Sequence, residues 1–140
     1  SNKRQRNELI YTAVSTQNAR TTHEYMVRRF LKKPVGYPDH RMIELAIWST
    51  WAEYKININE SVVLEFANKI KENGFENSQL EIDDLWETCY GSFYVDTKRF
   101  PDLKRLNLQL KKMGFRVTIW IHPFINKGCE PWYSEALNKG

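Results

Sequence analysis

Carboxylates and aromatic rings stand at the ends of three apolar segments of the sequence. Trp48 ends the first segment, Asp83 and Asp84 end the second, and Trp120 and His122 end the third. Carboxylates accept paired hydrogen bonds from vicinal hydroxyls, and aromatic rings pack on the apolar face of a pyranose. This mixture is typical of a site that holds a sugar in water. All five residues are therefore candidate substrate-binding residues.

Each candidate also has a structural interpretation. An aspartate at a strand end can cap the following loop, and a tryptophan in a strand usually belongs to the core. For Asp83 and Asp84 the functional interpretation is preferred. Core and sugar contact stay equally open for Trp48 and Trp120. For His122 a buried, hydrogen-bonded side chain is favoured over a metal ligand or a catalytic base, because no third partner is evident.

The adjacent aspartates are not expected to form the acid/base pair of a glycosidase. Consecutive strand residues point to opposite faces, whereas the carboxyls of a retaining pair lie about 5–5.5 Å apart across one bond. In a regular strand we expect Asp83 to face the interior, and Asp84 reaches the same site only if the chain turns there. Ser49 lacks the glycines of a nucleophile elbow and Cys89 lacks an activating neighbour, so covalent serine or cysteine catalysis is not predicted. No metal or cofactor is predicted.

The elements that must position these residues repeat along the chain. The phrases at residues 71–75 and 111–115 are related at a spacing of 40 residues. Each contains a glycine suited to a left-handed helix end and leads into an apolar strand. Asn59 or Ser61 is predicted to cap the first helix, and Asp102 the second. The predicted strands cover residues 42–48, 78–83 and 116–121.

A β-loop-α repeat of this length is typical of βαβ units, which need right-handed crossovers and a parallel sheet. The sheet can be open and doubly wound, or closed into a barrel. The turn at residues 49–54 contains no glycine, which argues against a dinucleotide or P-loop site and favours the barrel. Three units are too few to close one. We predict an α/β fold in which residues 41–140 form strands one to three of a (β/α)8 TIM barrel.

Residues 1–40 do not follow this pattern. A short strand is predicted over residues 8–14 and a helix over residues 22–32, which Pro34 ends. The breakers at residues 34–39 indicate a linker. A structural boundary near residue 40 is therefore expected.

Composition limits the class of protein and its partners. Of the 140 residues, 41% are hydrophobic, which is ample for a globular core. No apolar stretch approaches the roughly 20 residues of a membrane span, and no signal peptide is visible. The net charge of +4 comes from 21 basic residues interleaved with 17 acidic ones, so nucleic acid is not a predicted partner.

Two further features bear on the compartment. Cys89 and Cys129 lack metal-binding spacing and fall on predicted neighbouring loops of one face, and whether they form a disulfide stays open. The sequence Asn59-Glu60-Ser61 matches the acceptor pattern for N-linked glycosylation, which matters only in the secretory pathway.

Four ordered motifs resemble glycoside hydrolase family 31, and within it the branch related to the myogenesis-regulating glycosidase of animals. The resemblance covers residues 20 to 128. It is carried by Ile47 to Lys55, by Ser78 to Asp84, by Tyr90-Gly91 with Arg99-Phe100-Pro101, and by Ile121 to Asn126.

The resemblance implies a retaining α-glycosidase in which residues 1–40 are the tail of an N-terminal β-sandwich with a linker helix. Asp83 would bind hydroxyls of the sugar in the −1 subsite, and Trp48, Asp84 and Trp120 would line the same pocket. The commoner family pattern is Asp-Ile-Asp-Tyr where this chain has Glu81 to Asp84. Glucose specificity is therefore not carried over, and α-galactosides are the first expected substrates.

The family's nucleophile and acid/base are aspartates on later strands, expected beyond Gly140. The chain alone is therefore expected to be inactive, and its expected partners are a carbohydrate and the rest of its own barrel. A truncated relative that binds only a sugar or a partner is the alternative. The resemblance also implies the lumen of the secretory pathway or the outside of the cell.

Overall fold

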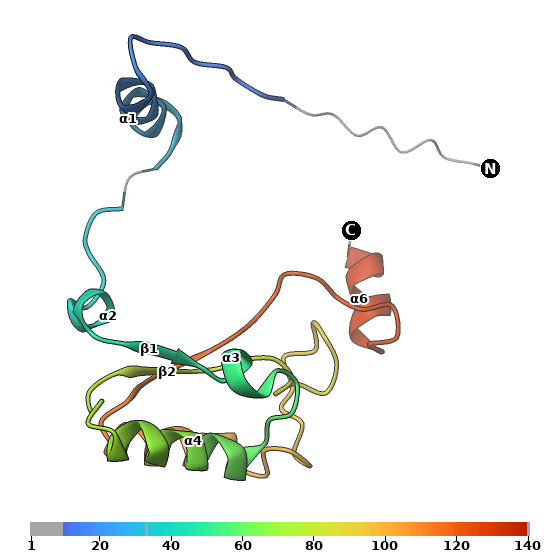
Figure 1. The fold of residues 1–140 in the computed structure, drawn as a ribbon. Helices are drawn as coiled ribbons and strands as arrows, with labels where there is room; N and C mark the ends of the chain where they lie inside the picture. Colours follow the sequence, from blue (N-terminus) through green and yellow to red (C-terminus); the bar gives the residue numbers. More distant parts are fainter. Residues whose placement is uncertain (1–9, 33, 140) are drawn as a thin grey trace. The chain divides into compact units, whose positions relative to one another are not determined.

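The computed structural model describes residues 10–32 and 34–139, and the chain divides into two compact units, residues 1–37 and 38–140 (Figure 1). In the first unit, α1 spans Ala19–Phe30. Asn18 caps it, because its side chain accepts a hydrogen bond from the Thr21 backbone N–H. The strand predicted over residues 8–14 is wrong for residues 10–14, which pair with no other strand. Glu8 and Leu9 lie outside the described residues.

The second unit holds a parallel sheet of three strands in the order β1 (Ile47–Ser49), β2 (Gln79–Ile82) and β3 (Arg116–Ile119). This confirms the α/β fold with a partial sheet of parallel strands. In sequence, α4 (Glu60–Glu72) joins β1 to β2, and α5 (Leu103–Lys112) joins β2 to β3. The core between sheet and helices contains buried side chains from all these layers, including Val63, Ala67, Leu80, Ile82, Leu106 and Leu110.

In the second unit, α4 and α5 begin and end where the sequence predicts, whereas α1 begins and ends earlier than the predicted residues 22–32. The side chains of Asn59 and Asp102 accept hydrogen bonds from the first turns of α4 and α5. Gly74 and Gly114 follow the helices with φ of 79° and 98°. In this left-handed region a side chain is strained, so glycine lets the chain leave the helix at once and enter the next strand.

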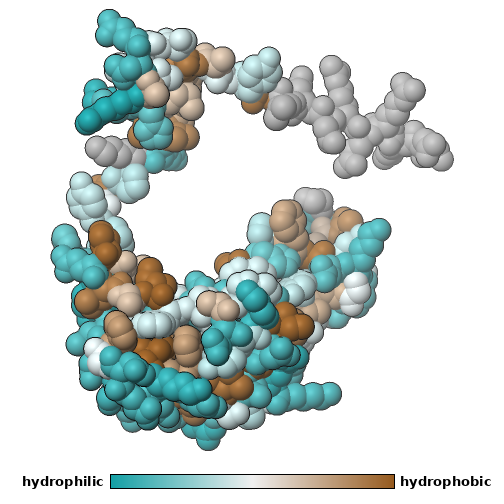
Figure 2. All heavy atoms as spheres, in the orientation of Figure 1, coloured by the Kyte–Doolittle hydropathy of each residue, from teal (hydrophilic) through white to brown (hydrophobic). Residues whose placement is uncertain are grey.

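The first strand is shorter than predicted. Residues 41 to 44 form the short helix α2 (Arg41–Glu44) and only the end of the predicted segment 42–48 is extended. Asp39 explains the difference, because its carboxylate accepts hydrogen bonds from both the backbone and the side chain of Arg41. Such local bonds compete with strand pairing. Met42, Ile43, Leu45 and Ile47 stay exposed, and Figure 2 shows apolar side chains gathered over α2 and the start of β1.

Besides α2, two further helices were not predicted: α3 (Thr50–Tyr54), directly after β1, and α6 (Trp132–Lys139). Ser49 caps α3 by accepting the backbone N–H of Trp51. Within the described ranges 10–32 and 34–139, no helix has the length and apolarity needed to cross a membrane.

Candidate functional site

Strand register gathers polar side chains on the sheet face that points away from α4 and α5. Ser49 pairs with Glu81, and Glu81 pairs with Thr118. Side chains alternate along a strand, so Asp83 and Trp120 fall on this same face, one pair further along. We call it the inner face, because in a closed barrel it would point to the axis.

Asp83 is the most firmly held of the five candidates. Its side chain accepts a hydrogen bond from Ser49 Oγ at 2.9 Å, and its backbone N–H donates to Thr50 Oγ1 at 3.0 Å. The residue is only 8% exposed. Contacts from the end of β1 thus fix the position of a carboxylate at the end of β2.

Asp84 reaches the same site because β2 ends at Ile82 and the chain turns. The expectation that the two side chains diverge in a regular strand does not apply. The backbone N–H of Asp84 donates to Asp83 Oδ1 at 2.7 Å, and both residues line a cavity of about 170 Å³ together with Trp51 and Trp120. Two carboxylates and two indoles therefore meet at one place.

Tyr90 lies against Asp84. Its hydroxyl donates to Asp84 Oδ2 at 2.6 Å. This hydrogen bond, with a smaller contribution from burial, raises the pKa of Tyr90 to about 12. The hydroxyl therefore stays protonated, and a donor, across the physiological range.

Glu81 adds a third carboxyl to the inner face. Burial, followed by the neighbouring carboxyl of Asp83, raises the pKa of Glu81, and Ser49 opposes this shift. The site thus contains a carboxyl that retains its proton more readily than a free glutamate does.

Trp48 lies away from the site, which corrects its prediction as a substrate-binding residue. It precedes Ser49, so alternation turns it to the opposite face of the sheet. There its ring makes edge contacts with Phe66 and Phe75, at centroid distances of 6.3 and 5.1 Å.

Trp51 takes the place in the cavity that was predicted for Trp48. It belongs to α3, and Lys55 Nζ lies 5.1 Å from the centroid of its ring. Its position in the loop after β1 was the available signal, because the strand-end loops of barrels carry their sites.

His122 lies next to the cavity but does not line it. Its ring is 4.8 Å from that of Tyr90 and 5.2 Å from that of Trp120, and its Nδ1 atom accepts the backbone N–H of Phe124 at 3.1 Å. The side chain is hydrogen-bonded but only half-buried, and its role as a substrate-binding residue stays a prediction. No group of three or more metal-ligating side chains occurs in the part of the chain that the structure describes.

Cys89 and Cys129 form a disulfide with a Cα–Cα distance of 5.6 Å. The bond joins the loop after β2 to the segment after β3. Asn59, the residue that caps α4, is exposed.

Residues 41–140 match the model of the TIM-barrel domain of glycosyl hydrolases family 31. The chain belongs to this family. It is 40% identical over 119 residues to the mouse myogenesis-regulating glycosidase, a match that covers 85% of this chain and 17% of that protein. The predicted family and branch are thereby confirmed.

Two other curated proteins are less similar to the chain. The chain is 31% identical over 80 residues to a probable α-galactosidase of Dictyostelium discoideum, covering 52% of this chain and 21% of that one. It is 28% identical over 96 residues to an α-xylosidase of Emericella nidulans, covering 67% and 12%. The chain thus spans about one fifth or less of the length of these curated relatives.

Solved structures support the fold of this family 31 domain. An α-galactosidase from Lactobacillus brevis superposes with a TM-score of 0.59 at 20% identity, over 68% of this chain and 14% of that one. An α-galactosidase from Thermus thermophilus gives 0.58 at 23% identity, over 67% and 19%. At these identities the likeness shows the fold alone, an α/β fold with a sheet of three parallel strands.

Proposed function

We propose that this chain supplies one wall of the −1 sugar subsite of a retaining α-glycosidase. The convergence of Asp83 and Asp84 with Trp51 and Trp120 carries the proposal. Asp83 and Asp84 would accept hydrogen bonds from sugar hydroxyls, while the indoles would contact the apolar face of the ring. His122 would hold Tyr90 and Trp120 in place through its ring contacts with both.

The first candidate substrate is an α-galactoside. Of the relatives, one is named a probable α-galactosidase and another an α-xylosidase. The chain has Glu81 and Asp84 where the commoner family pattern has aspartate and tyrosine. Asp84 and Tyr90 together place a carboxylate and a phenol close to the positions that would contact the sugar.

Catalysis itself would need residues from other barrel strands. Glycosidases of this kind use two carboxyls on either side of the scissile bond. Asp83 and Asp84 lie side by side on one wall, where Ser49 and Tyr90 already engage them. We therefore expect the nucleophile and the acid/base outside residues 1–140, and no hydrolysis by this chain alone.

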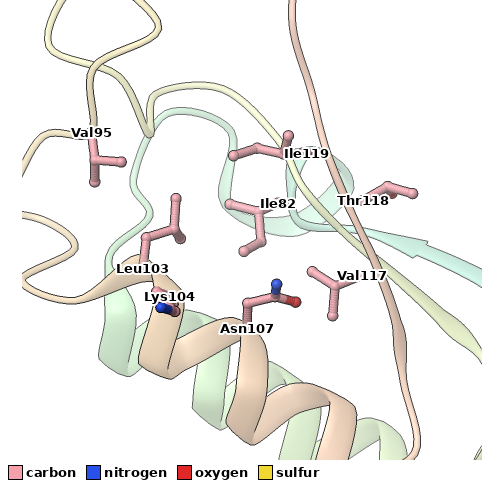
Figure 3. Close-up of a pocket in the computed structure, with 8 residues that line it drawn as sticks. All are labelled: Ile82, Val95, Leu103, Lys104, Asn107, Val117, Thr118 and Ile119. Carbon is pink, nitrogen blue, oxygen red and sulfur yellow. The ribbon is translucent and has the colours of Figure 1, made fainter.

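The rest of the barrel is the proposed partner of the outer edge of β3. A groove of about 380 Å³ lies between this edge and α5, and Figure 3 shows apolar side chains lining it. Asn107 Oδ1 is buried there without a hydrogen-bond partner among the described residues. A further strand and helix would cover the partly exposed apolar residues Val95, Leu103, Val117 and Ile119.

The test is an assay of the full-length protein with p-nitrophenyl α-galactoside, α-glucoside and α-xyloside. We expect hydrolysis of at least one of them, with retention at the anomeric carbon when the first product is followed by NMR. Asp83→Asn should lower kcat/KM by at least about a hundredfold, whereas Glu76→Gln, a change at an exposed residue, should not. A folded full-length protein that hydrolyses none of them but binds the sugar would favour the non-catalytic alternative.

We also propose that the protein works in the secretory pathway lumen or outside the cell, with a glycan on Asn59. The disulfide favours an oxidising compartment. Asn59 Oδ1 accepts from the Val62 N–H and the Ser61 hydroxyl, and the residue is exposed. The amide nitrogen can thus carry a sugar while the oxygen continues to cap the helix.

Removal of N-glycans from the natively expressed protein tests this modification. The loss in mass should be smaller by one glycan in Ser61→Ala than in the wild-type protein. Asn59→Asp, which keeps an oxygen to cap α4, should show the same reduction. Equal losses in all three proteins would refute the glycan on Asn59.

A further inference from the structure

The loop after β2 is fastened to the segment after β3 by several independent contacts. The Cys89–Cys129 disulfide is one of them. The backbone N–H of Asn126 donates to the carbonyl oxygen of Tyr90 at 3.0 Å, which places a hydrogen bond one residue from the disulfide. Covalent and hydrogen bonds therefore fix the backbone on which Tyr90 stands.

The same loop is also braced from inside. The buried carboxylate of Glu87 accepts the backbone N–H groups of Gly91 and Phe93 at 3.2 and 3.0 Å. The indole N–H of Trp86 donates to the carbonyl oxygen of Trp120 at 2.7 Å. These contacts fix the backbone of the loop and therefore the positions from which its side chains extend.

The Tyr90 side chain is held at both ends. Its backbone is fastened to Asn126, its ring lies 4.8 Å from that of His122, and its hydroxyl donates to Asp84 Oδ2. Asp84 itself lies beyond the last paired residue of β2, so the sheet does not fix its side chain. The Tyr90 hydroxyl is the one side-chain donor to Asp84 among the described residues.

We infer that Tyr90 is a positioning residue for sugar recognition by Asp84, and that the Cys89–Cys129 disulfide holds Tyr90 in that position. The hydroxyl occupies Oδ2 and leaves Oδ1 for a sugar hydroxyl. This inference rests on the proposed glycosidase function. It extends that function, because sugar recognition by Asp84 would depend on the position of Tyr90, and that position would depend on the disulfide.

The test compares Tyr90→Phe with Tyr94→Phe in the full-length protein, using p-nitrophenyl α-galactoside, or whichever of the three substrates the wild type hydrolyses best. Tyr94 lies in the same loop, is 61% exposed, and its hydroxyl makes no hydrogen bond with the described residues. Tyr90→Phe should raise KM about tenfold and leave kcat within about threefold, because an Asp84 side chain that has lost its hydrogen bond to Tyr90 binds the sugar less well in the ground state and the transition state alike. Tyr94→Phe should leave both unchanged.

A purely structural role for Tyr90 would give a different result. Partial unfolding lowers the fraction of active enzyme, so it reduces kcat and leaves KM unchanged. That pattern, or wild-type values of both constants, would overturn the inference. A wild-type protein that hydrolyses none of the substrates would instead remove the proposed function on which it rests.

The disulfide is tested by the double substitution Cys89→Ala with Cys129→Ala. It should raise KM by about the same factor as Tyr90→Phe, and adding Tyr90→Phe to it should raise KM little further. Treatment of the folded wild-type protein with dithiothreitol gives the same comparison without a new folding step, and the double variant serves as its control. An unchanged KM after reduction at these two cysteines would overturn the role of the disulfide.

Discussion

Trp48 and Trp120 are chemically alike, but their side chains point to opposite faces of the sheet because side chains alternate along a strand. Trp48 is paired with Leu80, a core residue, whereas Trp120 follows Thr118 on the inner face. Trp48 therefore packs against the rings near α4, and Trp120 lines the cavity with Asp83. The same side chain can stabilise the fold at one position and contact a ligand at the other.

Alanine substitutions should separate these two roles. Trp48→Ala should destabilise the full-length protein by about 2 kcal/mol, less than for a fully buried tryptophan, and leave KM unchanged. Trp120→Ala should raise KM for the substrate with a smaller fall in the thermal midpoint. Thermal unfolding and steady-state kinetics on both variants provide the check. If KM rose in Trp48→Ala but not in Trp120→Ala, the assignment of the two roles would be wrong.

Glu81 should make stability depend on pH. Its pKa is raised in the folded state by burial and by Asp83, so the folded protein binds this proton more tightly than the unfolded chain does. The stabilisation is complete below the unfolded pKa and is lost as pH rises through the folded pKa. The Glu81→Gln variant has no proton to lose at this position, so its stability should not fall for this reason as pH rises.

The thermal midpoint of Glu81→Gln relative to wild type should therefore increase as pH rises above about 4.5 and then level off. Scanning calorimetry of both full-length proteins at a series of pH values measures this difference. Glu76→Gln, at an exposed site, is the matched control. A difference that stays constant with pH would show that Glu81 does not titrate abnormally.

Much of the site could be predicted from residue types at strand ends, and some of it could not. Once the register is known, alternation predicts the face on which Asp83 and Trp120 lie. Register depends on the pairing between strands, however, and cannot be predicted from the sequence of one strand alone. Asp84 required a turn directly after Ile82. Trp51 required α3, a helix of five residues, which is too short for hydrophobic periodicity to reveal.

At the scale of elements, Gly91 marks a close approach between two loops. It has a φ of 93°, and a Cβ atom added there would lie 2.7 to 2.9 Å from atoms of Ile125 and Phe124. Gly74 also has a positive φ, of 79°, but a Cβ atom there would meet nothing within 4 Å. A substitution at Gly74 would therefore meet backbone strain alone, whereas one at Gly91 would meet backbone strain and steric crowding.

Gly74→Ala should cost about 1 kcal/mol, from backbone strain alone. Gly91→Ala should cost clearly more, because the two loops must also move apart, and it should raise KM through the loss of the Tyr90 geometry. Thermal unfolding and kinetics of both full-length variants test this. Equal costs would mean that the loops yield easily and do not hold Tyr90.

The elements themselves were largely predictable, because their ends carry local signals. Asn59 and Asp102 begin the helices and the glycines end them, and each of these signals acts within a few residues. The N-terminal part of the segment 42–48 was not predictable from its apolar content. There, the hydrogen bonds that Arg41 donates to the Asp39 carboxylate favour a turn over strand pairing.

At the scale of the whole molecule, the three-stranded sheet has an outer edge at β3. The backbone N–H groups of Arg116 and Trp120 donate to Ser78 and Ile82 of the β2 side. Alternation turns the N–H groups of Val117 and Ile119 to the outer edge. An open edge next to an apolar groove invites another strand, and a barrel supplies one from its own chain.

Hydrogen exchange tests whether the full-length protein closes this edge. The amides of Val117 and Ile119 should be protected as strongly as those of Arg116 and Trp120, because a further strand would accept their hydrogen bonds. In the isolated 140-residue chain the same two amides should exchange much faster than the other two, at a concentration where the chain is monomeric. The Gln79–Ile82 strand provides the internal reference in both samples. Fast exchange of Val117 and Ile119 in the full-length protein would mean that β3 remains an edge, and the proposed pairing with a further barrel strand would be wrong.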